Sequence, residues 1–287
     1  MTRPRKRFGQ HFLTSQWAEK VVHAIKPEPG DVLLEIGPGT GAITLPLAAT
    51  GVPILAIEID RDLAAELASR VPGNVSLMTG DFLSMDVMPF LTGLEPQRLG
   101  PPGRSGHAPE AARARARFRI VGNLPYNLSS AIMFRLIDLH RRHGVFADAT
   151  LMLQREVADR LVAVPGTKAY GTLGVSAQLH TRITRLLDLP PGAFRPAPKV
   201  HSSVVRLEFG PPAVRIVDEH LFDRLVRSLF AARRKMLSNA LKQFDPRGPA
   251  ILAQSGLDGR RRPETLDVTE IATLAELFAV ANRPTPA

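Results

Sequence analysis

Short runs of apolar residues alternate with segments of helical composition through the first two thirds of the chain. We predict that these runs are buried strands, because they are apolar and too short to be helices. They lie at residues 32–36, 53–59, 75–78, 118–121 and 150–153. Residues 61–70, between the second run and the third, have the composition of a helix that packs on one face. Strands separated by helices indicate an α/β fold with a mostly parallel sheet.

The pattern changes towards the C-terminus. Residues 175–189 and 203–209 are predicted as two more strands, which we expect to form an antiparallel pair at one edge of the sheet. The segment 210–212 (Gly-Pro-Pro) indicates a linker, and apolar residues then recur at helical spacing up to a last helix from about Thr269. The sequence therefore predicts an α/β domain over residues 1–209 and a small all-helical domain over residues 210–287.

Residues 93–117 follow neither pattern. They are rich in Pro, Gly, Arg and Ala and show little apolar periodicity, which predicts a long, basic surface loop. Two interpretations of this loop stay open: it contacts nucleic acid, or it is an insertion without a role.

Charge and the lack of cysteine narrow the function. Of the 287 residues 44% are hydrophobic, which is enough for a sizeable core. The absence of cysteine excludes disulfides, thiolate metal sites and cysteine nucleophiles, and we expect no metal site. A net charge of +10 favours a polyanionic partner, because a basic surface attracts phosphates and releases counterions.

Neither a secretory signal nor a membrane helix fits the apolar pattern. The basic N-terminus is not followed by an apolar segment, and the longest apolar stretch, 45–57, is interrupted by two prolines and a glycine. That stretch is also shorter than the roughly 20 residues that a membrane helix needs. We therefore expect a soluble, cytoplasmic protein.

Gly37, Gly39 and Gly41 follow the first predicted strand. Residues without side chains let the backbone turn sharply and approach a ligand closely. Their G-x-G-x-G spacing differs from the G-x-G-x-x-G of dinucleotide-binding loops. Glu58 ends the second predicted strand, where a carboxylate can accept hydrogen bonds from two ribose hydroxyls.

Asp81 and Phe82 follow the third predicted strand. The Asp81 carboxylate can accept a hydrogen bond from an adenine amino group, and the Phe82 ring can lie against the adenine. Together with the glycine loop and Glu58, they predict a pocket for a cofactor that contains adenosine. A structural turn at the glycines and a helix N-cap at Asp81 are the alternative interpretations.

Asn123, Leu124, Pro125 and Tyr126 come directly after the fourth predicted strand, at the edge where ligands gather in open parallel sheets. The exocyclic nitrogen of adenine is a poor nucleophile, because its lone pair is delocalised into the ring. The Asn123 side-chain oxygen and a backbone carbonyl beside Pro125 can accept its hydrogens and aim the nitrogen at a sulfonium methyl group. Tyr126 offers a flat face for a base that has left its stack, a contact of roughly 1–3 kcal/mol. The alternative is a loop in which Pro and Asn only make a turn.

These motifs resemble those of the ribosomal RNA adenine dimethyltransferases, the KsgA-type enzymes, which dimethylate two adjacent adenines near the 3′ end of small-subunit (16S) rRNA. The matching segments span nearly the whole chain. They are 7–13, 35–41, 122–127, 152–157, 168–171, 194–200 and 233–237, together with Glu58 and Asp81. The resemblance implies a Rossmann-like class I methyltransferase sheet, S-adenosyl-L-methionine as cofactor and a role in small-subunit biogenesis.

The resemblance also implies how the cofactor is held. His11 and Leu13 would contribute to the cofactor site from the N-terminal segment, with Gly37 at the methionine part. Glu58 would hold the ribose, and Asp81 would hold the adenine. Many members of the family have Asn where this chain has His11.

For the target base, the resemblance implies three contacts. Asn123 would bridge the cofactor and the target amine, while Tyr126 and Phe194 would hold the base between their rings. The loop at 93–117 is longer than usual for the family, which puts local substrate contacts in doubt but not the chemistry.

Basic residues concentrate between positions 224 and 262, where there are ten of them and two acids. A net surplus of eight on a small helical module suits docking on rRNA phosphates, which position a protein without reading sequence. A solvated helix face is the alternative. The residues expected to contact RNA are Arg224, Arg227, Arg233, Arg234 and Lys235.

Other functions stay open at this point. A large-subunit rRNA adenine methyltransferase of the erythromycin-resistance type would share the pocket, but Leu124 and the segments 168–171 and 233–237 favour the small-subunit enzyme. A ribosome-assembly checkpoint factor could bind RNA and methylate only incidentally, whereas a small-molecule methyltransferase would have no use for the basic module. We expect a monomer that acts on small-subunit rRNA within a 30S particle, without a membrane partner.

Overall fold

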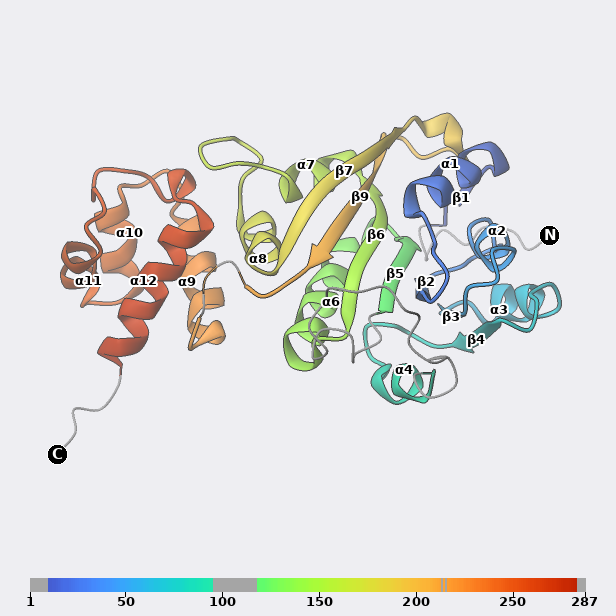
Figure 1. Cartoon of the computed structure of the whole chain (residues 1–287). Helices are drawn as coiled ribbons and strands as arrows, with labels where there is room; N and C mark the ends of the chain where they lie inside the picture. Colours follow the sequence, from blue (N-terminus) through green and yellow to red (C-terminus); the bar gives the residue numbers. More distant parts are fainter. Residues whose placement is uncertain (1–9, 95–117, 213, 215, 283–287) are drawn as a thin grey trace. The chain divides into compact units, whose positions relative to one another are not determined.

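The computed structural model describes residues 10–94, 118–212, 214 and 216–282 (Figure 1). The chain divides into two compact units. The first comprises Met1–Ala158 and Thr184–Phe209, and the second comprises Asp159–Ile183 and Gly210–Ala287. The predicted loop at 93–117 lies outside the described residues from position 95 onwards.

The first unit is built on a seven-stranded sheet with the order β4-β3-β2-β5-β6-β9-β7. The pairs from β4 to β6 are parallel, and β9 is antiparallel to β6. All residues of β2 and β3 are buried, as expected for strands that are covered on both faces. The five predicted strands and the mostly parallel sheet are confirmed. The strands are β2 (Val32–Ile36), β3 (Ile54–Glu58), β4 (Val75–Thr79), β5 (Phe118–Asn123), β6 (Phe146–Gln154), β7 (Thr181–Leu189) and β9 (Ser202–Phe209).

Helices connect these strands. A second, very small sheet includes part of the N-terminal segment. In that sheet β1 (Phe12–Leu13) pairs antiparallel with β8 (Phe194–Arg195), which follows the 3₁₀ turn η2 (Pro191–Ala193). The predicted helix at 61–70 is confirmed as α3. The helices are α1 (Ser15–Ile25), α2 (Thr44–Ala48), α3 (Arg61–Ala68), α4 (Met88–Leu94), α6 (Ser129–His143) and α7 (Arg155–Leu161).

The strand predicted at 175–189 is wrong in its first part. Residues Thr172–His180 form helix α8, and only Thr181–Leu189 is a strand, which lies beside β9 at the sheet edge. A short apolar run cannot be assigned to a helix or a strand from periodicity alone. Here Gly174 lets the helix approach its neighbour closely, because a Cβ at this position would lie 2.5 Å from the carbonyl oxygen of Arg160.

The second unit is helical. One hydrophobic cluster holds it together, and Tyr170, Val175 and Leu179 belong to this cluster. For this reason the segment 159–183, which ends in the first residues of β7, groups with the helical unit, whereas the predicted division into 1–209 and 210–287 placed it in the first domain. The elements are α8, α9 (Glu219–Ala231), α10 (Leu237–Phe244), α11 (Gly248–Ser255), the 3₁₀ turn η3 (Pro263–Thr265) and α12 (Val268–Ala281).

The described residues hold neither a membrane-spanning helix nor a metal-binding cluster. No helix in this part of the chain has the length and apolar character needed to cross a membrane. The same residues hold no group of three or more His, Cys, Asp or Glu side chains that could bind a metal ion.

A buried arginine fixes α1 to the sheet. Arg119 on β5 is 9% exposed and forms ion pairs with Asp31 and with Asp148, the latter at 2.9 Å. Its guanidinium also donates to the carbonyl oxygens of Ile25 at 2.7 Å and Lys26 at 2.9 Å, at the C-terminal end of α1. These bonds satisfy carbonyls that a helix end leaves without a partner, and they compensate for the desolvation of the guanidinium.

We expect Arg119→Ala to lower the free energy of unfolding by about 3 kcal/mol, because two largely buried carboxylates lose their partner. Urea denaturation followed by circular dichroism measures this change. Arg142→Ala is the control, since Arg142 pairs with Asp138 on the surface of α6 with 65% of its side chain exposed. Its removal should cost less than about 1 kcal/mol, and equal losses in the two variants would contradict the assigned role of Arg119.

Candidate active site

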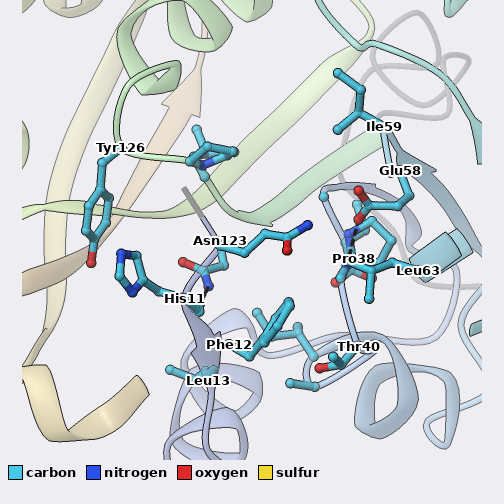
Figure 2. Close-up of a pocket in the computed structure, with 18 residues that line it drawn as sticks. His11, Phe12, Leu13, Pro38, Thr40, Glu58, Ile59, Leu63, Asn123 and Tyr126 are labelled. Atoms are coloured by element: carbon cyan, nitrogen blue, oxygen red, sulfur yellow. Dashed lines mark hydrogen bonds between the residues drawn. The ribbon is translucent and has the colours of Figure 1, made fainter. Parts of the chain in front are cut away.

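A cavity lies where β2, β3 and β5 end (Figure 2). Parallel strands end at the same edge of a sheet, so segments that are far apart in the sequence meet there. The cavity is bounded by the glycine loop, the end of β3, the segment 123–126 and the N-terminal segment, which we define as residues 10–13. The lining residues are Gln10, His11, Phe12, Leu13, Glu35, Gly37, Pro38, Gly39, Thr40, Ala42, Ile43, Glu58, Ile59, Leu63, Asn123, Leu124, Pro125 and Tyr126.

The loop after β2 turns at glycines with positive φ angles. Gly37 has φ +70°, and no described atom lies within 4 Å of the place where its Cβ would stand. Gly39 has φ +57°, and a Cβ there would lie 3.2 Å from the Phe12 ring, so glycine lets the N-terminal segment pack against the loop. Gly41 lies away from the cavity, against Leu67, and its place in a cofactor site stays a prediction.

Two buried carboxylates face this cavity. Glu58 is 4% exposed and accepts hydrogen bonds from the backbone N–H groups of Gly39 and Asp60, both at 2.9 Å. Burial raises the pKa of Glu58, while these backbone donors lower it. Glu35 is 2% exposed, and its Oε2 has no hydrogen-bond partner among the described residues. Burial raises the pKa of Glu35 to about 7, and the charge of Glu58 adds to this rise.

The segment 123–126 places an amide and an aromatic ring beside the two carboxylates. The Asn123 side chain donates from Nδ2 to the His11 carbonyl oxygen at 2.8 Å. Leu124 is buried, and its N–H donates to the Met152 carbonyl, which fixes the turn after β5. The Tyr126 hydroxyl shares a 2.6 Å hydrogen bond with the Ser202 hydroxyl, so the ring has a defined orientation.

The N-terminal segment crosses the cavity and is held at several points. Gln10 donates from Nε2 to Asp60 Oδ2 at 3.2 Å, next to the end of β3. The His11 ring stacks on the Tyr126 ring, with centroids 5.4 Å apart and 25° between the planes. The two side chains lie next to each other in Figure 2. Its Nδ1 lies 2.8 Å from the Pro196 carbonyl oxygen and donates to it. Leu13 is buried and pairs with β8, so the segment is part of the cavity wall.

Besides Gly41, three of the residues expected at the site do not line the cavity. Asp81 accepts a hydrogen bond from the Leu83 N–H at 2.9 Å, and Phe82 is 4% exposed. Phe194 is fully buried among the apolar residues around β1 and α1. The proposed contacts of these side chains with adenine rings therefore stay predictions.

Other lining residues were not expected from the sequence. Ile59 follows Glu58 and is 41% exposed at the cavity, where an apolar side chain can lie on a flat ring. Gln10 and Phe12 belong to the N-terminal segment, and Glu35 precedes the glycine loop. The positions of Gln10 and Phe12 depend on packing between segments that are far apart in the sequence. Ile59 ends a run that the sequence predicts as buried, so the pattern gives no signal of its exposure.

The basic residues of the helical unit fall into two groups. Arg224 and Arg227 on α9 are exposed, as are Arg234 and Lys235 between α9 and α10. Arg233 instead pairs with Glu264 at 2.8 Å and donates to the Lys168 carbonyl. Three further arginines also pair with acids, which leaves less of their charge for a partner; the pairs are Arg247–Asp245, Arg260–Asp258 and Arg261–Glu270.

Comparison with known proteins agrees with this architecture. A solved dimethyladenosine transferase from Plasmodium falciparum superposes with a TM-score of 0.72 at 22% identity, covering 94% of this chain and 98% of that one. The 23S rRNA methyltransferase ErmE superposes with a TM-score of 0.63 at 23% identity, covering 93% and 99%. At these identities the two structures show a common fold.

Sequence relatives are more similar. The chain is 40% identical to the Ribosomal RNA small subunit methyltransferase A of Xylella fastidiosa over 275 residues, 94% of each protein. It is 41% identical to the protein of the same name from Aromatoleum aromaticum over 285 residues, 98% of this chain and 94% of the relative. A model of the family described as Ribosomal RNA adenine dimethylase matches residues 1–280. The chain therefore belongs to the ribosomal RNA adenine dimethylase family, whose cofactor is S-adenosylmethionine.

Proposed function

We propose that this chain dimethylates the N6 amino groups of two adjacent adenines near the 3′ end of small-subunit rRNA. It acts as a monomer on a 30S particle in the cytoplasm and thereby takes part in small-subunit biogenesis. Family membership and the names of its relatives support the reaction and the class of substrate. The observation that carries the proposal is the Asn123 amide, which is fixed between the two buried carboxylates and the Tyr126 ring.

The cavity fits S-adenosylmethionine, which when bound supplies an electrophilic methyl group on a positively charged sulfur. Glu35 has an unpartnered carboxylate oxygen at the cavity, and a buried carboxylate is stabilised by a nearby cation. The open space in front of Gly37 lets a ligand approach the loop closely. The lone pairs of Glu58 that the backbone leaves free can accept from ribose hydroxyls, and Ile59 can cover an adenine ring.

The bond between Asn123 and His11 supports one orientation of the amide towards the substrate. Nδ2 is engaged with the His11 carbonyl, so Oδ1 is the atom that can accept a hydrogen from the target amine. The Pro125 carbonyl accepts from the Leu128 N–H at 3.0 Å, which makes the Leu124 carbonyl the better second acceptor. Two acceptors on one amine localise its lone pair and orient it towards the cofactor side of the cavity.

No protein side chain has to remove a proton before the methyl group is transferred. The amine carries two hydrogens, and its nitrogen would become cationic as the new carbon–nitrogen bond forms and the methyl–sulfur bond of the cofactor breaks, with the electron pair of that bond remaining on sulfur. The proton is then acidic and leaves to solvent, which restores a neutral amine with one hydrogen. The one remaining N–H can donate to either of the two acceptors, which holds the amine for a second transfer.

The exposed cations of the helical unit suit docking on RNA phosphates. Arg224, Arg227, Arg234 and Lys235 project into solvent, where each can neutralise a phosphate. Contacts of this kind give affinity that falls with salt and carry no sequence information. Recognition of the adenines then depends on the cavity in the first unit.

We expect Asn123→Ala to reduce methyl transfer to 30S particles at least roughly 100-fold, because an acceptor that strengthens in the transition state is lost. Binding of the particle should change less than twofold. Mass spectrometry of the rRNA measures dimethyladenine, and Asn239→Ala on the exposed face of α10 is the control. Equal loss of transfer and binding, or methylation found only in 50S particles, would contradict the proposed function.

The affinity for S-adenosylmethionine should rise by roughly tenfold between pH 6 and pH 8. The pKa of Glu35 is about 7, the cationic cofactor favours the ionised carboxylate, and a proton therefore competes with it at low pH. Glu35→Gln should weaken binding at pH 8 and flatten this dependence. Isothermal titration calorimetry measures the affinity and its pH dependence, and Glu19→Gln at an exposed position is the control. A Glu35→Gln variant that keeps the wild-type pH profile would rule out this coupling.

Arg234→Ala should weaken binding to 30S particles and lower the slope of log affinity against log salt by about 1, because one phosphate contact is lost. Arg260→Ala, which removes an exposed arginine that already pairs with Asp258, should change the slope much less. Filter binding between 50 and 300 mM KCl measures the slopes. If both variants keep the wild-type slope, the helical unit does not dock through these phosphate contacts.

A further inference from the structure

The aromatic face that the target base needs is already occupied by a side chain of this protein. The His11 and Tyr126 rings lie 5.4 Å apart at 25°, within the range of about 4.5–7 Å for stacked aromatic pairs. The two rings are in direct contact, so no base fits between them in this arrangement. Figure 2 shows His11 and Tyr126 facing one another at the same end of the cavity as Asn123.

The imidazole is anchored but can leave without disturbing the backbone below it. Among the described residues, its ring has one hydrogen bond, from Nδ1 to the Pro196 carbonyl at 2.8 Å. Asn123, in contrast, is held by the His11 backbone carbonyl, which is independent of where the ring points. A rotation of the His11 side chain can therefore uncover Tyr126 while the catalytic amide keeps its orientation.

Phe194 cannot take the place of the imidazole in this arrangement. Its side chain is fully buried, and it belongs to the apolar cluster that also contains Leu13. Among the described residues that line the cavity, His11 is thus the one whose ring lies on Tyr126.

We propose that His11 is a specificity-determining residue. Its imidazole occupies the face of Tyr126 on which the target base stacks, until an adenine displaces it. This inference rests on the proposed function, since the displacing group is the target base. Only a base that both stacks on Tyr126 and bonds to Asn123 gains enough to replace the imidazole contact. Bases that stack but cannot donate an amine hydrogen to Asn123 are rejected by this competition.

The ring variants His11→Ala and His11→Asn test the proposal, because both keep the backbone carbonyl that holds Asn123. The activity assay uses 30S particles at saturating S-adenosylmethionine, so a change in cofactor affinity does not enter the result. We expect the KM for the particle to fall roughly two- to tenfold in both variants, the range that one aromatic stack is worth. The exposed His23→Ala variant is the control and should keep the wild-type KM.

A second measurement does not depend on turnover. An RNA hairpin that carries 2-aminopurine at the target position is titrated with the full chain and saturating S-adenosylhomocysteine, and fluorescence quenching reports stacking on Tyr126. Tighter quenching with both ring variants supports the placeholder role. A raised or unchanged KM together with weaker or unchanged quenching would overturn it. The His11 ring would then either be a fixed part of the base site or have no role in base binding.

Failure of the proposed function gives a different result. If the wild-type chain transfers no methyl group to adenine in 30S particles, the function is wrong whatever the ring variants do. NMR then tests the ring contact itself, since the His11 ring protons, assigned with His11→Asn, should shift when Tyr126 is changed to Leu. Absence of that shift would also overturn the inference.

Discussion

Parallel pairing of β2 with β3 and β5 is the constraint on which the site depends. Ile36 lies beside Ile57 in one pair, and Glu35 lies beside Val121 in the other. Gly37 follows the end of β2, and Glu58 and Asn123 are the last residues of β3 and β5, so the three lie at the same edge of the sheet. A register shift of one residue would turn these side chains to the opposite face and separate the cofactor loop from the reacting amide. The fully buried β2 and β3 specify this register strongly.

Charge is distributed in opposite senses over the two units. The cavity holds two buried acids, Glu35 and Glu58, where a cationic cofactor lowers the cost of their burial. The helical unit instead exposes arginine and lysine to solvent, and several other arginines there are engaged by acids of the same unit. The net charge of +10 therefore reflects the basic surface of the helical unit, which suits an anionic partner. It does not reveal that the buried acids of the cavity suit a cationic ligand.

The sheet and the place of the segment 123–126 at its edge could be predicted from sequence because they depend on local patterns. Buried runs of five residues and motifs that directly follow them, such as Asn123–Tyr126, are readable without tertiary contacts. Helix α8 could not be recognised, because its apolar residues are buried by packing on distant helices. The stacking of His11 on Tyr126 and the burial of Phe194 also depend on the pairing of β1 with β8, which joins segments about 180 residues apart.

That pairing is only two residues long, with Phe12 beside Arg195 and Leu13 beside Phe194. So short a ladder contributes few hydrogen bonds, and elements of this size open locally at free energies far below that of global unfolding. The cavity wall formed by residues 10–13 therefore has far fewer ladder bonds than the seven-stranded sheet on which the reacting groups stand. The two sides of one cavity thus differ in how strongly backbone pairing holds them.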